Sequence, residues 1–201
     1  MGSDRLTQQI GFIVEIDKLK QVLRQTLLLD APRQENDAEH SWHLAVMAVL
    51  LSEYAREEVD LFLVVKMLLV HDLVEIDAGD TFAYDEKGNE DKDEREREAA
   101  DRIFNLLPED LAAELYALWE EFEDRKTPEA RFAAALDRFQ PLLLNYRSEG
   151  AAWKRHGVRS DQVIAYNGHM VEGAPELWAR ARAMVEDAVH KGWLAPARNS
   201  S

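Results

Sequence analysis

The sequence predicts an all-α protein, a single-domain bundle of about seven or eight helices, and three observations support this fold class. Glycine and proline are scarce, with 9 and 6 residues in 201, whereas strong helix formers are plentiful. Apolar residues recur every three or four positions, and no segment alternates as a strand does. The apolar content of 46% is enough for a continuous core. We expect one domain over 1–201, with its core at about 6–146 and a helical extension at about 147–201.

Three helices are expected in the first part of the chain. The first, over 4–29, carries leucine and isoleucine at helical spacing and ends before Pro32. The second begins at Asp37, which is an expected N-cap, and continues to about residue 56. The third, over 60–76, is apolar on nearly every face, which is typical of a central buried helix.

A polar loop over 81–91 separates these helices from a charged one. The run from Asp91 predicts a helix with a solvated face that ends at Pro108. A further helix over 109–124 is rich in leucine and aromatic residues. The middle of the chain is therefore expected to be helical, with one long loop.

The last part of the chain has clear helix starts. Thr127 is an expected N-cap, Pro128 occupies the first helical position and Glu129 the first turn, so a helix should continue to about residue 146. Residues 148–160 are expected to be irregular. A helix should follow from about residue 160, and a last one should begin after the break at Pro175.

Charge and composition exclude several classes of protein. The formal net charge of −15 disfavours a general nucleic-acid binder. The absence of cysteine excludes disulfides, a thiol nucleophile and a cysteine zinc site. The most apolar stretch, Leu61–Val70, is far shorter than the roughly 20 residues that cross a bilayer, and the first residues do not resemble a signal peptide. We expect a cytoplasmic protein without a nucleic-acid or membrane partner.

The most informative feature is a group of ionisable residues at the end of the apolar helix over 60–76. His71 and Glu75 are four residues apart and Asp72 and Glu75 three apart, so the three side chains project from neighbouring parts of one helix. Buried carboxylates require a cationic partner. Either a metal ion or ion pairs with Lys66 and arginines could provide it.

Two other helices carry candidates of the same kind. His40 lies near the start of the second expected helix, and Asp137 follows small apolar residues in the helix from Pro128. Together with His71 and Asp72 they would offer two imidazoles and two carboxylates. Such a nitrogen and oxygen set suits Mn, Co, Fe, Zn or Mg.

The order His40, then His71-Asp72, then Asp137 resembles the H…HD…D pattern of the HD-domain metal-dependent phosphohydrolases. The flanking residues match as well, and over about 6–146 they resemble the branch that contains the bacterial 5′-deoxynucleotidases. The matching segments are 33–40, 71–75, 79–80, 127–131 and 136–137.

This resemblance implies an activity and roles for the residues. His40, His71, Asp72 and Asp137 would hold one divalent cation, and Glu75 and Asp80 match the catalytic carboxylates of the family. The implied reaction is hydrolysis of the phosphate monoester of (deoxy)nucleoside 5′-monophosphates by a metal-activated water. The resemblance also implies a small-molecule nucleotide as partner and favours a homodimer.

Two arginines are expected to contact the substrate. Arg33 is a candidate phosphate clamp, because a guanidinium fork suits phosphate oxygens. The deoxynucleotidases carry an Arg-Trp pair on the first helix, and Arg24-Gln25 is the best match to it after a one-residue shift in the spacing to Arg33. Gln25 stands in the place of the tryptophan, which puts deoxynucleoside selectivity in doubt. Trp42 is expected to be a packing residue.

Other activities stay open. The same metal site would serve an HD-type phosphodiesterase or a nucleotide pyrophosphohydrolase. A non-catalytic metal-binding regulatory protein would need neither Glu75 nor Asp80. A di-iron carboxylate bundle would need Glu-x-x-His on two helices, and only Asp37-x-x-His40 approaches that motif.

Overall fold

The computed structural model describes residues 4–29, 33–85, 87–88 and 90–198, and it confirms the all-α fold class. Three short 3₁₀ helices, η1 (Asp17–Gln21), η2 (Ser52–Tyr54) and η3 (His71–Val74), connect the α-helices. The α-helices are α1 (Arg5–Ile16), α2 (Asp37–Leu51), α3 (Leu61–Val70), α4 (Glu75–Ala78), α5 (Lys92–Phe104), α6 (Glu109–Asp124), α7 (Pro128–Arg147), α8 (Ala151–His156), α9 (Ser160–Asn167), α10 (Met170–Gly173) and α11 (Pro175–His190).

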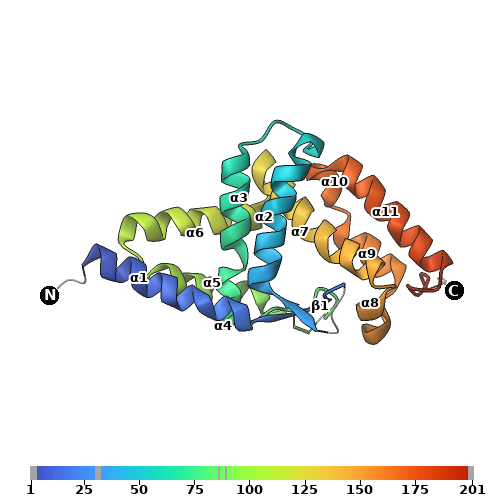
Figure 1. Cartoon of the computed structure of the whole chain (residues 1–201), viewed down its shortest axis with the longest axis horizontal. Coiled ribbons are helices and arrows are strands. Elements are labelled where there is room, and N and C mark those ends of the chain that lie inside the picture. The colour runs from blue at the N-terminus through green and yellow to red at the C-terminus, as the bar shows by residue number, and fades with distance from the viewer. Residues whose placement is uncertain (1–3, 30–32, 86, 89, 199–201) are drawn as a thin grey trace.

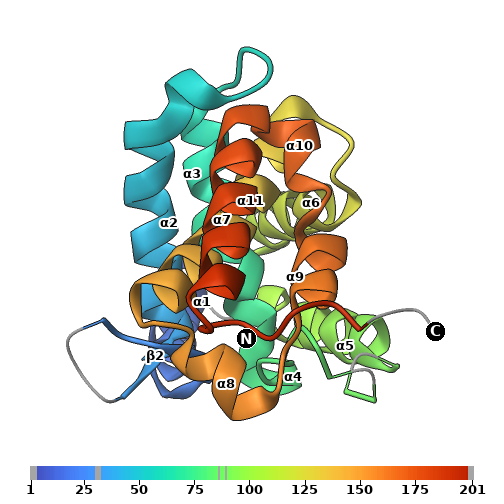
Figure 2. The same cartoon turned by 90° about the vertical axis from the view of Figure 1, so that its right-hand side faces the viewer.

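The helices form an elongated arrangement around a central group (Figure 1). Helices α2, α3 and α7 pack together in the middle, and α1, α5 and α6 lie at one end. Helices α8 to α11 lie at the other end and face the viewer in Figure 2. No helix among the described residues is long and apolar enough to cross a membrane.

Two apolar clusters hold these parts together. The larger one joins α2, α3 and α7 to the C-terminal helices, with Leu44, Met67, Phe132 and Met170 fully buried. The second one joins α1, α5 and α6 to the end of α3. Burial of large apolar side chains contributes about 1.5–3 kcal/mol each, so both ends of α3 are fixed by packing.

The expected helix over 4–29 is wrong beyond residue 21. Residues after η1 form strand β1 (Leu23–Leu27), which pairs with β2 (Gln34–Asn36) in a two-stranded antiparallel sheet. The helical spacing of leucines continues through this segment, but backbone pairing with β2 determines its conformation. The expectation that no segment forms a strand was therefore also wrong.

Helix α2 begins one residue earlier than a cap at Asp37 would require. Asn36 is the N-cap, and its side chain accepts a hydrogen bond from the backbone N–H of Glu39, whose carboxylate accepts one from the N–H of Asn36. This capping box fixes the turn before His40. Asp37 is free to place its carboxylate in the interior, where it is fully buried.

The expected helix over 60–76 is divided at the ionisable residues. Helix α3 ends at Val70, and His71 to Val74 form a tighter 3₁₀ turn before α4. Gly79 ends α4 with a φ of 75°, a left-handed conformation that glycine adopts without strain, just before Asp80. The residues 71–80 therefore lie on a compact curved segment.

Residues 148–160 were expected to be irregular, but they contain α8. Gly150 precedes this helix with a φ of 73°, and a Cβ at this position would lie 2.0 Å from the carbonyl oxygen of Trp193. The close approach joins α8 to the C-terminal segment, and this tertiary contact has no signal in the local sequence.

Candidate metal centre and substrate cavity

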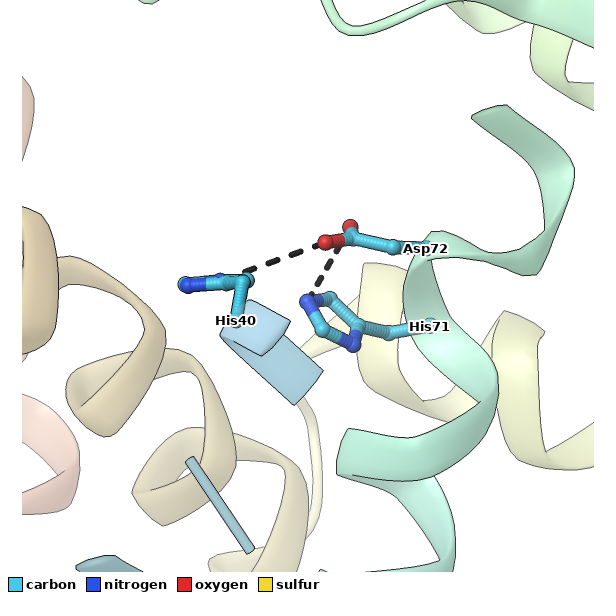
Figure 3. Close-up of side chains that lie close together, drawn as sticks. All are labelled: His40, His71 and Asp72. Carbon is cyan, nitrogen blue, oxygen red and sulfur yellow. Dashed lines mark ion pairs between the residues drawn. The ribbon is translucent and has the colours of Figure 1, made fainter. Parts of the chain in front are cut away.

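His40, His71, Asp72 and Asp137 meet at the centre of the fold, although they come from α2, η3 and α7. The Nε2 atom of His40 lies 2.9 Å from Asp137 Oδ1, and Nε2 of His71 lies 3.0 Å from Asp72 Oδ1 and 3.7 Å from Asp137 Oδ1. Figure 3 shows Asp72 directed towards both imidazoles. Ligand atoms of His40, His71 and Asp72 lie within 4.8 Å of one another, which is close enough for one ion to contact all three.

The hydrogen bonds of the two histidines fit a metal site. His71 Nδ1 lies 2.9 Å from the carbonyl oxygen of Leu68, so Nδ1 carries the proton and donates it. The lone pair of Nε2 then faces the carboxylates, and among the described residues this buried Nε2 has no hydrogen-bond partner. An acceptor nitrogen that faces carboxylate oxygens is stable only with a cation or a proton between them.

The orientation of His40 follows from a chain of buried polar groups. Gln140 Nε2 donates to Glu35 Oε1 over 2.6 Å, so the amide must present Oε1 to His40 Nδ1, 3.1 Å away. Nδ1 of His40 is therefore the donor and Nε2 is free to act as a ligand. All three side chains are buried, so this arrangement is rigid.

The pKa values of these groups also indicate a place for a cation. Burial alone would raise the pKa of Asp137, but Arg138 and the adjacent imidazoles of His40 and His71 lower it well below its usual range. Burial lowers the pKa of His40 to about 4. Burial also lowers the pKa of His71, but the carboxylates of Asp72 and Asp137 outweigh this effect and raise the pKa to about 9. The proton that His71 takes up at Nε2 therefore occupies the position at which a metal ion would bind the same nitrogen.

A second acidic group shares Asp72 with the first. Ligand atoms of Asp37, Asp72 and Glu75 lie within 4.8 Å of one another. Arg24 already provides a cation to this group, because its Nη1 lies 3.0 Å from both Asp37 Oδ1 and Asp72 Oδ2. The other cation considered from the sequence, Lys66, forms its ion pair with Glu114 instead.

Glu75 lies at the edge of this second group. It is 6% exposed, and among the described residues its Oε2 has no hydrogen-bond partner. Burial, followed by Asp72 and Asp37, raises the pKa of Glu75 well above its ordinary value. Burial also raises the pKa of Asp80. Both groups are thus carboxyls that hold a proton more readily than usual.

A cavity of about 470 Å³ opens beside these residues. Its lining includes Glu75 and Asp80, three of the four candidate metal ligands and Arg24. His40 lies behind the lining and is fully buried. The volume falls in the ~300–1,000 Å³ range of small-molecule sites, so the cavity can hold a ligand larger than phosphate.

Arg33 and Trp42 do not lie where the sequence suggested. The guanidinium of Arg33 pairs with Glu39 at 2.6 Å on the surface, and its side chain is 53% exposed. The described lining of the cavity does not include it. Trp42 was expected to be a packing residue, but this prediction is wrong for the interior of a single chain, because the residue is 64% exposed.

Several residues of the site were missed at the sequence level. Arg138 lines the cavity, and its Nε lies 3.6 Å from Asp137 Oδ2. Lys92 lines it too, and Gln140 with Glu35 supports His40 from behind. Adjacent residues of a helix project about 100° apart, so the position of Arg138 next to Asp137 gave no signal for a shared site.

Comparisons with known proteins agree with this arrangement. The family model described as "HD domain" matches residues 16–178. The human protein named 5′-deoxynucleotidase HDDC2 is 36% identical over 135 residues, which are 67% of this chain and 65% of the relative. The bovine protein of the same name is 35% identical over 67% of this chain and 64% of its own length. The chain thus spans slightly less than two thirds of the length of these curated relatives.

Solved structures show the same fold. A protein from Magnetospirillum magnetotacticum MS-1, described as a predicted metal-dependent phosphohydrolase, is 58% identical with a TM-score of 0.90, and the match covers 96% of this chain and 99% of that one. A conserved hypothetical protein from Pyrococcus furiosus is 21% identical with a TM-score of 0.61, over 90% of this chain and 99% of its own. The second likeness concerns the fold alone.

Proposed function

The chain belongs to the HD domain family, and from this premise we propose that it is a metal-dependent phosphohydrolase acting on the phosphate monoester of (deoxy)nucleoside 5′-monophosphates. The observation that carries the proposal is the meeting of two imidazoles and two carboxylates at one end of a cavity large enough for a nucleotide. The names of the relatives from human and cattle support the substrate class, and the description of the Magnetospirillum structure supports the reaction class.

The four candidate ligands would hold one divalent cation. His40 and His71 would each offer Nε2, and Asp72 and Asp137 would each offer a carboxylate oxygen. Mn, Co, Fe, Zn and Mg all accept such ligands. A divalent cation in this place lowers the pKa of a bound water and takes up charge from the phosphoryl group.

The two other carboxyls of the cavity would handle protons. In hydrolysis an oxygen–phosphorus bond to water forms, the bond from phosphorus to the 5′ oxygen breaks, and the leaving alcohol gains a proton. Glu75 would orient the attacking water and accept its proton, and its unpaired buried Oε2 supports this role. Asp80, also in the lining, would donate a proton to the leaving alcohol.

Cationic side chains would attract the substrate in this acidic protein. Arg24, Lys92 and Arg138 all line the cavity. Arg24 would also hinder binding of a second metal ion, because it already pairs with Asp37 and Asp72, which could otherwise serve as ligands. This favours a one-metal monoesterase over a two-metal phosphodiesterase.

A phosphate-release assay tests the proposed function. We expect metal-loaded protein to release phosphate from nucleoside 5′-monophosphates and not from cyclic nucleotides or nucleoside triphosphates. Asp72→Ala should abolish release, whereas Asp77→Ala on the exposed side of α4 should not. Ring opening of a cyclic nucleotide releases no phosphate, so chromatography should follow the nucleotides themselves. Conversion of cyclic nucleotides to monophosphates without further hydrolysis would favour the phosphodiesterase. No turnover of any ester with full metal occupancy would favour the non-catalytic regulator.

We also propose that two copies of the chain associate through an apolar surface on α2 and α3. The exposed residues of α2 follow helical spacing on one face, and α3 adds two more. The surface consists of Trp42, Val46, Val49, Leu50, Phe62 and Leu69. Sedimentation should show a dimer that Val49→Lys converts to a monomer, while Glu98→Lys on α5 leaves it intact. A monomeric wild-type protein at micromolar concentration would contradict this.

A further inference from the structure

The cavity continues beyond the candidate metal centre into the C-terminal part of the chain. Its lining joins His71, Asp72 and Asp137 to residues of α8 and α9, which lie at the end of the molecule that faces the viewer in Figure 2. A phosphoryl group at the metal end would fill only part of about 470 Å³. The remaining space needs an occupant that suits its walls.

Four aromatic side chains line this distal part, and we call them the aromatic wall: Phe82, Tyr84, Trp153 and Tyr166. Phe82 and Tyr84 come from the loop after α4, whereas Trp153 and Tyr166 come from α8 and α9. The rings of Phe82 and Tyr84 lie 5.3 Å apart and those of Tyr84 and Tyr166 lie 5.6 Å apart. Ring contacts therefore join the loop after α4 to α9 through Phe82, Tyr84 and Tyr166, and Trp153 lines the same cavity from α8.

Arg138 connects the aromatic wall to the metal end. Its Nε lies 3.6 Å from Asp137 Oδ2, and its Nη1 donates a hydrogen bond of 2.6 Å to the hydroxyl of Tyr166. The guanidinium also lies over the ring of Tyr166, 4.5 Å from its centre. Arg138 therefore links Tyr166 directly to Asp137, a candidate metal ligand, and fixes the position of the tyrosine ring.

Three described residues of the cavity lining each carry a buried polar atom without a hydrogen-bond partner. Arg138 Nε, Asn145 Oδ1 and His169 Nε2 are buried atoms of cavity-lining residues, and none has a hydrogen-bond partner among the described residues. They offer a donor, an acceptor and a ring nitrogen that can be either. The rings are inclined to one another, by 75° between Phe82 and Tyr84 and by 55° between Tyr84 and Tyr166, so they offer both faces and edges to a ligand. Aromatic side chains beside a few polar groups are typical of a site for a heteroaromatic ring rather than for a sugar alone.

We infer that the aromatic wall is a nucleoside-binding subsite in which Tyr166 contacts the base and Asn145, His169 and Arg138 supply the polar contacts. This inference rests on the proposed function, because it assumes that the phosphate is held at the metal end. It assigns the C-terminal helices a role in substrate selection. The subsite would distinguish nucleotides from simple sugar phosphates by contacts with the base.

Two substrates of different size test the inference. We expect kcat/KM of the wild-type protein for thymidine 5′-monophosphate to exceed that for 2-deoxyribose 5-phosphate by about 10-fold or more. Tyr166→Leu keeps most of the volume but removes the flat ring. It should lower kcat/KM for the nucleotide by roughly 5- to 100-fold, mainly through KM, which is the range for losing one contact between a base and an aromatic ring. The preference for the nucleotide should shrink accordingly.

Tyr146→Leu is the matched control, because Tyr146 lies in the same part of the fold but its hydroxyl donates to Asp187 and the described cavity lining does not include it. This variant should keep the wild-type preference. An unchanged preference in Tyr166→Leu, or an equal loss for both substrates, would overturn the inference. If Tyr166→Leu does not fold by thermal melting, Tyr84→Leu replaces it with the same expectation.

Binding of thymidine separates this inference from the proposed function. The nucleoside has no phosphate, so calorimetry with the wild-type protein reports the subsite even if no phosphate ester is hydrolysed. Binding that Tyr166→Leu or Tyr84→Leu weakens at least about 5-fold supports the subsite. Absence of thymidine binding to the wild-type protein overturns it, whatever the activity.

Discussion

At the scale of single residues, the site depends on which groups hold the metal and which move protons. His40, His71, Asp72 and Asp137 approach one another through ring nitrogens and carboxylate oxygens. Glu75 lies outside this set and keeps an unpaired oxygen. The two kinds of role can be separated by substitutions that preserve shape.

Glu75→Gln should leave metal content nearly unchanged and lower turnover by about 10² to 10⁴, the usual range for losing a general acid or base. Substrate binding should survive, because a neutral amide does not repel phosphate. Asp77→Asn, on the exposed side of α4, is the control. Metal analysis beside steady-state kinetics checks the prediction. Loss of metal together with activity would make Glu75 a ligand instead.

Gln140→Leu should weaken metal binding by about 10- to 100-fold, the range for removing a hydrogen bond behind a ligating histidine. The reason is that His40 Nδ1 loses its acceptor and Glu35 loses its donor. A metal titration followed by activity measures the effect, with Gln9→Leu on α1 as the control. Unchanged affinity would show that the tautomer of His40 is fixed by other means.

The sequence could predict some of these residues and not others. His40, His71, Asp72 and Asp137 belong to a recognisable ordered pattern, and the structure brings them together. Gln140 and Arg138 have no motif, because their roles follow from packing of α7 against other elements. Arg33 matched the flanking residues but pairs with Glu39 on the surface. Motifs thus locate the candidate ligands of one ion, but not the residues that would act through a neighbour.

At the scale of elements, the site needs α2, the turn after α3 and α7 in fixed positions. The capping box at Asn36 sets the start of α2, and Thr127 accepts a hydrogen bond from the N–H of Ala130 at the start of α7. The cap at Thr127 was predictable from Thr-Pro-Glu. Strand β1 and helix α8 were not, because contacts distant in sequence determine them.

Asn36→Ala should reduce the free energy of unfolding by about 1 kcal/mol, the typical cost of losing an N-cap side chain. The N–H of Glu39 loses its acceptor in this variant. Asn36→Asp, which keeps a capping oxygen, should stay close to wild type. Urea unfolding followed by circular dichroism measures both. Equal stability of the alanine and aspartate variants would contradict a capping role.

Two glycines should respond to alanine in opposite directions. A Cβ on Gly173 would lie 2.0 Å from the carbonyl oxygen of Arg131, where α10 packs on α7, so Gly173→Ala should destabilise by about 1–3 kcal/mol. A Cβ on Gly11 meets nothing within 4 Å in the middle of α1, so Gly11→Ala should stabilise by about 0.5–1 kcal/mol. The same unfolding experiment measures both changes. A neutral Gly173→Ala would contradict the close packing.

At the scale of the whole molecule, one ion would join three elements that are far apart in sequence. A metal that binds only the folded chain shifts the unfolding equilibrium by mass action. The charge of −15 makes the surface acidic, yet Arg24, Lys92 and Arg138 gather at the cavity. The described part of the same lining carries six carboxyl groups, so attraction of an anionic substrate there would depend on a bound divalent cation as well as on these side chains.

Addition of a divalent metal to stripped protein should raise the melting temperature, and His71→Ala should remove this rise because it deletes one of four ligands. His156→Ala, a histidine of α8 outside this set, should keep it. Differential scanning calorimetry with and without chelator measures the effect. Full metal content in His71→Ala by elemental analysis would refute its assignment as a ligand.

The central claim, that a water attacks phosphorus in a nucleoside 5′-monophosphate, is tested most directly by the fate of oxygen. Metal-loaded protein should hydrolyse thymidine 5′-monophosphate in water enriched in ¹⁸O, and mass spectrometry should find one ¹⁸O atom in each released phosphate and none in thymidine. Label in thymidine would show that the carbon–oxygen bond breaks instead. Absence of phosphate release under full metal occupancy would contradict the account as a whole.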